Sequence, residues 1–473
     1  MRAEDAYLFR HAVLRDAAYQ VQLPGDRARL HELAFAIIES LHGGPAPEPP
    51  PLDAIDPPRM QPHPTDSVAE ELAYHARLAR EANDSSLAGF SRAYVRYLHR
   101  AAEIASRQYR PVLAAELWRV LAAELSGAAR GEALRLAADE LASGGMGPAA
   151  RLALEQALAV FREGGHRLHE FKAVGQLGLL LHQFGETKEA MQLLESAVQG
   201  LAESGAHRLA AAALNNLAMI QMHAGDLDSA EARIREVLET ASRLQSQRLE
   251  GEALAHLASV AQIRGRLDEA QELYSRALAI HRKAGNRTFE CSTLGNLAGV
   301  SLETGQFDKA DDYFHQTVEI CRATGFRRSL AIAIGNHAVS LSRRGQKQQA
   351  IEEFEQAIAI NREIGNLRSE GVARGNLAES LHETGRSELA TRYFEAALAI
   401  HQRVGNPYHH GVHLCAFARC LLALGRRDEA EANWRKGALL LQQLGDASSL
   451  EQQRGLMVSE CSLLGQAPID PPA

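Results

Sequence analysis

The chain has 473 residues, of which 46% are hydrophobic and only 5% aromatic, and its formal net charge is −8 at pH 7. Lysine and arginine are spread among the acids rather than gathered into a basic stripe, which argues against nucleic acid as the main partner. No apolar run approaches the length of about 18 residues that a membrane span needs, the start of the chain is not that of a signal peptide, and the five cysteines form no disulfide framework, which fits a reducing cytoplasm.

Residues 1–42 differ from the rest of the chain. The pattern consists of Phe9, His11, Leu14, Ala18, Tyr19, Leu23, Arg27, Arg29, Leu30, His31 and Ala34. It resembles a segment of bacterial multidomain signalling ATPases (adenylate cyclases, protein kinases and transcription activators), where it follows the ATPase core. That resemblance implies a signalling ATPase, kinase or cyclase module as a candidate partner. Because the pattern starts close to Met1 and no G-x-x-x-x-G-K-[ST] loop occurs, we expect a sensor arm without the catalytic part.

Residues 43–66 are predicted to be a linker. Nine of the sixteen prolines lie between Pro45 and Pro64. Proline removes a backbone donor and favours extended polyproline II, so we expect a semi-rigid or disordered spacer. The helical pattern returns at Ser67, a candidate N-cap with Glu70 as its capping-box partner. Residues 67–125 are then predicted to form degenerate helical repeats.

A strict period governs the remaining chain. A looser copy with Gly145 and Ala150 comes first, and further glycines then follow forty residues apart, at Gly185, Gly225, Gly265, Gly305, Gly345, Gly385 and Gly425. Apolar residues recur at i, i+3 and i+4 on both sides of Gly305, which predicts two amphipathic helices that end at Gly305 and Gly325. Such a period indicates a solenoid. We therefore predict an array of helix pairs over residues 126–445, followed by a capping helix and tail over residues 446–473.

The repeated unit contains Leu297, Ala298, Gly305, Ala310, Phe314 and Ile320. It resembles the tetratricopeptide repeat in a forty-residue form, over roughly residues 84–445. The resemblance implies an all-α fold, a right-handed superhelical solenoid of about eight or nine stacked helix pairs. In that family the first helices line a concave groove, so the implied partner is a protein or peptide segment held there.

An asparagine row marks the candidate binding site. It comprises His256 and the asparagines at the equivalent position of four other first helices, which are Asn216, Asn296, Asn336 and Asn376. Asn215, which precedes Asn216, is included with them. Asparagine is a mediocre helix former, so its place in mid-helix needs a reason. An amide can donate to and accept from a peptide backbone. The run from Leu214 to Ala218 is similar to kinesin light chains, which bind cargo peptides through such asparagines.

Two interpretations of this row remain open. The asparagines bind a partner, or each of them bonds to the neighbouring repeat and stiffens the stack. The preceding glycines, Gly295, Gly335 and Gly375, leave the same choice between close approach by a ligand and tight helix packing.

No catalytic, cofactor or metal site is predicted. His409, His410, His413 and Cys415 form the only metal-like cluster, and no further ligand follows at a recognisable spacing. Neither G-x-S-x-G nor H-E-x-x-H occurs. The function expected is a cytoplasmic peptide-binding sensor arm or scaffold that regulates a signalling enzyme. The alternatives are a constitutive oligomerisation scaffold and a metal-dependent enzyme at residues 409–415.

Overall fold

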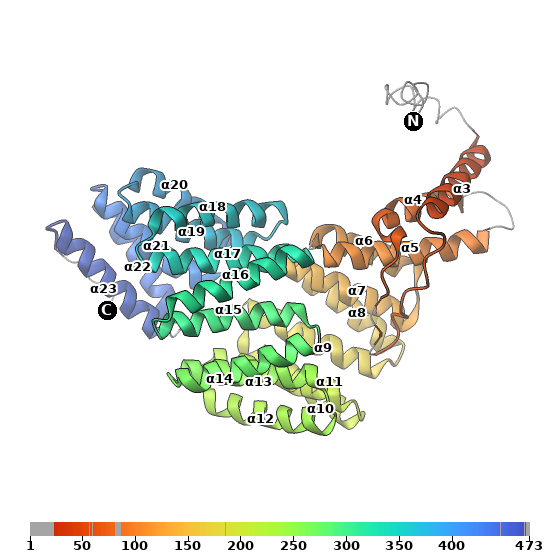
Figure 1. Cartoon of the computed structure of the whole chain (residues 1–473), viewed down its shortest axis with the longest axis horizontal. Helices are drawn as coiled ribbons and strands as arrows, with labels where there is room; N and C mark the ends of the chain where they lie inside the picture. Colours follow the sequence, from red (N-terminus) through yellow and green to blue (C-terminus); the bar gives the residue numbers. More distant parts are fainter. Residues whose placement is uncertain are drawn as a thin grey trace.

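The computed structural model describes residues 23–55, 57–58, 60–80, 87–108, 110–184, 186–444, 446–467 and 469. Within these residues the chain forms α-helices and one short 3-10 helix, without strands, so the predicted all-α solenoid of stacked helix pairs is confirmed (Figure 1). The N-terminal elements are α3 (Pro24–Leu41), η1 (Pro64–Val68), α4 (Ala69–Ala79), α5 (Leu87–Arg107) and α6 (Pro111–Glu124). Five of the eleven residues in the pattern that resembles signalling ATPases lie outside the described residues, and the other six fall on Leu23 and α3.

Eight regular helix pairs follow and match the forty-residue period. The pairs are α7 (Gly127–Ser143) with α8 (Gly147–Glu163), α9 (Arg167–Gln183) with α10 (Thr187–Glu203), α11 (His207–His223) with α12 (Leu227–Arg243), α13 (Gln247–Ile263) with α14 (Leu267–Lys283), α15 (Arg287–Glu303) with α16 (Phe307–Thr324), α17 (Arg327–Arg343) with α18 (Lys347–Glu363), α19 (Leu367–Glu383) with α20 (Ser387–Arg403), and α21 (Pro407–Ala423) with α22 (Arg427–Gln443). The last helix is α23 (Ala447–Leu463). Each second helix packs against the first helix of the next pair, and the buried residues form a succession of hydrophobic clusters along the array.

Turns between the helices need left-handed backbone. Gly305 and Gly325 have φ of +72° and +73°, as the sequence predicts for helix ends. Gln245, between α12 and α13, has φ of +50° and is the one non-glycine residue with positive φ in the described part of the chain. Corresponding turns elsewhere carry glycine, so Gln245 is the strained member of the series.

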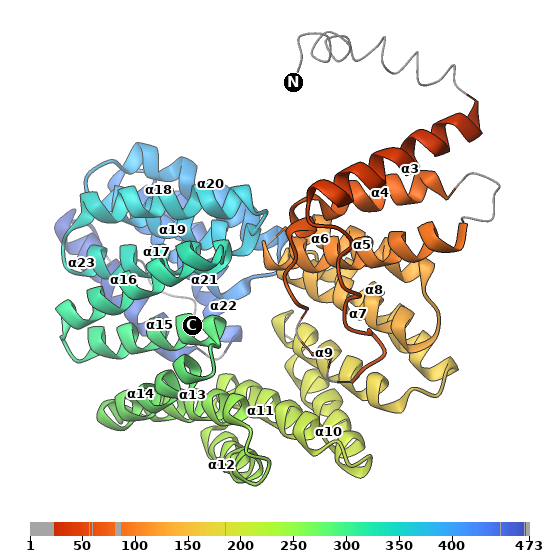
Figure 2. The same cartoon turned by 45° about the vertical axis from the view of Figure 1, so that its right-hand side comes forward.

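The solenoid curls until distant turns meet (Figure 2). A cavity of about 770 Å³ lies between the α5–α6 turn, with Arg110 and Pro111, and the two turns that contain Gly325 and Gly365. Phe184, at the end of α9, lies beside the α20–α21 turn, because a Cβ built on Gly405 would be 3.6 Å from its ring. The N-terminal pairs therefore touch the C-terminal ones.

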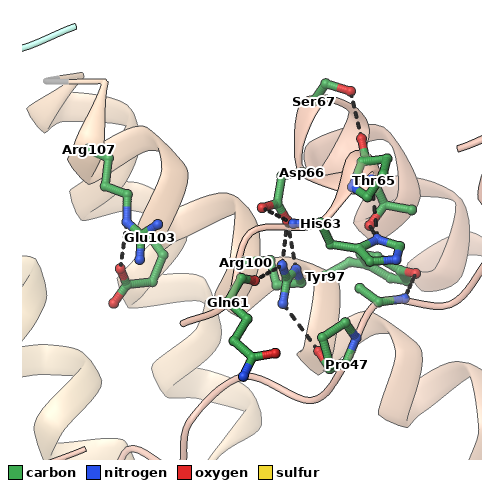
Figure 3. Close-up of polar contacts among 12 residues, drawn as sticks. Pro47, Gln61, His63, Thr65, Asp66, Ser67, Tyr97, Arg100, Glu103 and Arg107 are labelled. Atoms are coloured by element: carbon green, nitrogen blue, oxygen red, sulfur yellow. Dashed lines mark hydrogen bonds and ion pairs between the residues drawn. The ribbon is translucent and has the colours of Figure 1, made fainter. Parts of the chain in front are cut away.

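The described part of the proline-rich segment (residues 43–55, 57–58 and 60–63) is folded against α5, which differs from the semi-rigid or disordered spacer expected over residues 43–66. Arg100 of α5 is fully buried and binds this segment at both ends (Figure 3). Its Nη1 donates to the carbonyl of Pro47 at 3.2 Å, its Nη2 donates to the carbonyl of Gln61 at 2.8 Å, and its Nε donates to Asp66 at 2.7 Å. Tyr97 accepts from the amide of Ala46 at 3.1 Å. These contacts come from α5, which is distant from the segment in the sequence. Together they outweigh the preference of proline for a solvated, extended backbone.

The start of the next helix also differs from the prediction. Ser67 lies inside η1, where its hydroxyl donates to the carbonyl of Pro64. The capping box is formed by His63, whose ring accepts from the amide of Thr65, and Asp66, whose carboxylate accepts from the amide of His63 at 3.0 Å. The acidic group of the box also pairs with Arg100, so the cap and the proline-rich segment are held by one network.

Candidate peptide-binding surface

Two members of the asparagine row, Asn296 and Asn336, have exposed side chains. The first lies on α15 and the second on α17, and neither side chain hydrogen-bonds to a described residue. Asn216 on α11 is partly buried and also makes no side-chain hydrogen bond within the described chain. Helix geometry places equivalent residues of stacked first helices side by side.

 Two adjoining cavities follow this row. The Asn296 cavity lies between α15, α16 and α17. The volume of the Asn296 cavity is about 240 Å³, and the cavity is lined by Asn296, Phe314 and Thr317 among others. The Asn376 cavity, also of about 240 Å³, lies between α17, α18, α19 and the start of α21. Ile332 and Asn336 line both cavities, so the two form one continuous depression along the first helices.

The three glycines that precede asparagines of the row are explained by different surroundings. A Cβ added to Gly375 would lie 2.0 Å from the ring of His413, so tight packing explains this glycine. A Cβ on Gly295 would meet nothing within 4 Å, and one on Gly335 would meet only Ala357, at 3.9 Å. Gly295 and Gly335 line the two cavities, where they leave open space beside the exposed asparagines.

Other members of the row bond to the neighbouring repeat. The Oδ1 of Asn215 is 3.0 Å from Nδ1 of His256, and the Oδ1 of Asn376 is 3.2 Å from Nε2 of His413. Burial lowers the pKa of His256 to about 4, so its ring is neutral and can donate one proton to Asn215. The row therefore divides, with stacking contacts at Asn215, His256 and Asn376 and free amides at Asn296 and Asn336.

The bond from His413 continues to a second buried histidine. Nδ1 of His413 is 2.9 Å from Nε2 of His401, and burial lowers the pKa of His413 to about 3 and that of His401 to about 2. Both rings are thus neutral. We assign the tautomers from this network: His401 donates to His413, which donates to Asn376. Both nitrogens of His413 are used in this chain of bonds.

The metal-like cluster of the sequence is dispersed. The ring of His409 lies near His401 and His413, with centroids 6.0 Å from each, whereas Cys415 is buried against Gly437. Among the described residues no group of three or more His, Cys, Asp or Glu side chains could hold a metal ion. Nor does any described helix have the length and apolar character of a membrane span.

Arg368 is a site residue that the sequence analysis missed. It lies in the first turn of α19, lines the Asn376 cavity, and makes no ion pair or hydrogen bond with a described residue. Burial and the neighbouring guanidinium of Arg328 lower the pKa of Arg368, and no carboxylate offsets them. The only sequence signal is an arginine in a first turn, where acidic residues are favoured.

A buried amide adds a second donor beside Arg368. Asn406, which precedes α21, lines the same cavity and is 2% exposed, and its Nδ2 has no partner in the described structure. Its Oδ1 is 3.3 Å from Nδ1 of His409. An unpaired buried donor costs about 1–3 kcal/mol. The end of the cavity therefore offers a cation and an unsatisfied N–H, which together suit a carboxylate or carbonyl oxygen.

The proline-rich segment shows how the same face can hold a chain. Arg100 occupies the place in α5 that Asn296 occupies in α15, at the same distance from the end of the helix. Its guanidinium donates to two main-chain carbonyls of an extended segment. Farther along, Leu52 packs against the N-terminal core, and the backbone of Asp53 lies close to His169 of α9. The first part of the concave surface is therefore already occupied by the chain itself.

Comparison with protein families agrees with the repeat structure. The tetratricopeptide repeat model matches residues 209–283, 289–363 and 369–436, and a model of anaphase-promoting complex subunit 5 matches residues 165–210. The chain therefore contains tetratricopeptide repeats between residues 209 and 436. A search of curated proteins gives no match.

One solved structure supports the fold, and two others match with lower scores. A Rap protein in complex with competence and sporulation factor has 13% identity and a TM-score of 0.52, covering 71% of this chain and 94% of that one. A signal transduction ATPase with numerous domains and a tetratricopeptide repeat sensor, from Pyrococcus horikoshii, has 16% identity and a TM-score of 0.48 over 81% of this chain. The match spans 57% of the ATPase. Aspartyl phosphate phosphatase F from Bacillus subtilis has 12% identity and a TM-score of 0.46, covering 81% of this chain and 95% of that one.

Proposed function

We propose that this protein binds an extended segment of a partner protein along the two cavities between Asn296 and Asn376. The observation that carries the proposal is the pair of exposed amides, Asn296 and Asn336, which have no partner within the described chain and stand beside open space. Each cavity, at about 240 Å³, has room for a side chain rather than a helix. An extended backbone passing over the amides can both donate to them and accept from them.

The segment carries an acidic residue at the Asn376 cavity. Arg368 supplies a charge that no described carboxylate balances, and Asn406 supplies an unpaired N–H. A carboxylate bound here would give Arg368 a counter-ion and the Nδ2 of Asn406 an acceptor, which offsets the free energy that their burial costs. Such charge-assisted hydrogen bonds are among the stronger ones in proteins. Ile332, Phe354 and Val372 add apolar surface to the lining, which suits a hydrophobic neighbour in the segment.

Capture of this segment regulates a signalling enzyme in the proposal. Support comes from the N-terminal pattern that resembles signalling ATPases, because in that family repeats of this kind follow the ATPase core. The alternative, a constitutive scaffold, would act through the ends of the array and would tolerate changes in the cavities.

Random peptides displayed on phage, selected on the immobilised full chain, test the proposal. Recovered peptides should bind the double variant Asn296→Ala/Asn336→Ala roughly tenfold or more weakly, since each lost bond is worth about 0.5–1.5 kcal/mol. The matched control is Gln356→Ala, which removes an exposed amide from the outer helix α18. Equal binding to the double variant and to wild type would show that the cavities are not the site.

A further inference from the structure

Two free thiols face each other inside one helix pair. Cys291 lies on α15 and Cys321 on α16, and their Sγ atoms are 3.6 Å apart. They are 4% and 1% exposed. We propose that Cys291 and Cys321 form a site of reversible oxidation, at which a peroxide converts the two thiols to a disulfide that closes the α15–α16 pair beside the Asn296 cavity.

The repeat places these two positions where the helices of a pair come closest. At the position of Cys291 several other repeats have glycine, and a Cβ added there would lie 2.3–3.1 Å from the side chain at the position of Cys321, as in the pairs Gly131–Phe161, Gly251–His281, Gly371–His401 and Gly411–Leu441. In those repeats a large side chain fills the space over a glycine. In the α15–α16 pair two short side chains share it, so nothing separates the sulfurs.

The distance between the two sulfurs is close to what a disulfide requires. A disulfide needs Cβ atoms about 3.5–4.5 Å apart and a bond of about 2.05 Å, so the two sulfurs must approach by about 1.5 Å. Rotation about the side-chain bonds of Cys291 and Cys321 can supply most of this movement without a shift of either helix. The cross-link would therefore form within the native packing.

A small oxidant can reach one sulfur of the pair. Cys291 lines the Asn296 cavity, whereas Cys321 lies behind it. The neighbouring thiol lowers the pKa of Cys291 by hydrogen bonding to its sulfur, and the same interaction raises the pKa of Cys321. Cys291 is therefore the sulfur that reacts first, because it is the one that a peroxide in the cavity meets.

The reaction balances with hydrogen peroxide as the oxidant. The Cys291 thiolate attacks one peroxide oxygen and the O–O bond breaks, which gives a sulfenic acid and, after protonation, one water. The Cys321 sulfur then attacks the sulfenic sulfur, the S–S bond forms, and the hydroxyl leaves as a second water. Two thiols have lost two electrons and two protons to one peroxide, and a dithiol reductant reverses the change by exchange.

The other cysteines serve as internal controls. Burial raises the pKa of Cys415 to about 12 and that of Cys420 to about 11, which keeps both protonated. Cys461 contacts Met457, with the two sulfurs 3.9 Å apart. None of these three lines the Asn296 cavity. Oxidation of the native protein should therefore be selective for the α15–α16 pair.

Peptide mapping of the full chain after treatment with hydrogen peroxide tests the site. A tryptic digest under non-reducing conditions should contain residues 288–309 linked to residues 310–322, two hydrogen masses below the sum of the separate peptides, and dithiothreitol should release them. In Cys321→Ala, dimedone should trap a sulfenic acid on Cys291. Peroxide that leaves both thiols free, or that oxidises Cys291 to sulfinic acid in the native chain without forming the link, overturns the proposal.

The route through the cavity can be tested separately. Ile332→Trp fills the space that the Asn296 and Asn376 cavities share and should slow cross-linking several-fold, whereas Leu389→Trp, on α20 and equally exposed at 41%, should not. An unchanged rate in Ile332→Trp would overturn the assigned route. Any effect of the disulfide on partner binding rests on the proposed function, whereas the mapping contains no peptide ligand. Failure of the disulfide to form would therefore leave the binding proposal standing, and a binding failure would leave the disulfide standing.

Discussion

Asn336 and Asn376 occupy the same position of successive repeats, yet their replacement by alanine should have opposite effects on stability. In Asn376→Ala the Nε2–H of His413, a residue that is 1% exposed, loses its acceptor. A buried donor without a partner costs about 1–3 kcal/mol. Alanine returns about 0.5 kcal/mol through its better helix propensity. The net loss is therefore about 0.5–2.5 kcal/mol.

In Asn336→Ala no internal bond is lost, because the side chain is exposed and makes none with a described residue. Only the gain in helix propensity remains, about 0.5 kcal/mol. The two variants should thus differ by about 1–3 kcal/mol in the free energy of unfolding, and Asn336→Ala should be the more stable one.

Urea unfolding followed by far-UV circular dichroism measures this difference, and hydrogen exchange at the amides of α19 and α21 localises it. Since the bond between Asn376 and His413 joins α19 to α21, the loss in Asn376→Ala should be largest in those two helices. Gln356→Ala again serves as the control for an exposed amide. Equal losses in Asn336→Ala and Asn376→Ala would refute the division of the row into binding and stacking members.

Three further changes test other parts of the structure. Gln245→Gly should raise the free energy of unfolding, measured in urea, by about 1 kcal/mol. A non-glycine residue with positive φ costs roughly 1–2 kcal/mol, and the larger entropy that glycine loses on folding reduces the gain. No gain would mean that the turn is unstrained. Arg100→Met removes the guanidinium that donates to Asp66 and to two carbonyls, so it should lower the free energy of unfolding by about 3 kcal/mol. It should also speed hydrogen exchange at the amide of Ala46. Unchanged exchange would show that Arg100 does not hold the segment. The pKa of His413 is about 3 in the folded protein and about 6.5 in the unfolded chain, so the stability present above pH 6.5 should fall by about 2 kcal/mol at pH 5. His413→Asn should flatten this decline in thermal unfolding. A slope equal to that of wild type would assign the effect to other groups.

The repeat array could be predicted because its determinants are local. Glycines such as Gly305 end helices wherever they occur at that spacing, and Ala310 is small for the contact within its own pair. The proline-rich segment could not be predicted, because its position depends on Arg100 and Tyr97, which lie on a helix that the segment reaches only after folding. The composition of the segment describes its backbone preferences and contains no information about that partner.

The sequence could place the asparagine row on the first helices, but it could not assign the role of each residue. The period placed the asparagine row on the first helices, but whether an amide binds outward or bonds to the next repeat depends on the neighbour. Asn376 is used internally because histidine follows at His413, whereas the neighbours of Asn336 provide no such donor. Arg368 was missed for the same kind of reason, since its significance is the absence of an acid across the cavity.

The contact between Phe184 and the α20–α21 turn has a consequence for how the repeat number can vary. In an open solenoid, a whole repeat can be gained or lost with little penalty, because only nearest neighbours interact. Here the ring of Phe184 reaches Gly405 only if the rotations of all intervening repeats add up to one particular value. One inserted or deleted helix pair between them would carry Gly405 away from Phe184. Changes of repeat number should therefore be tolerated outside this closed stretch and rejected within it.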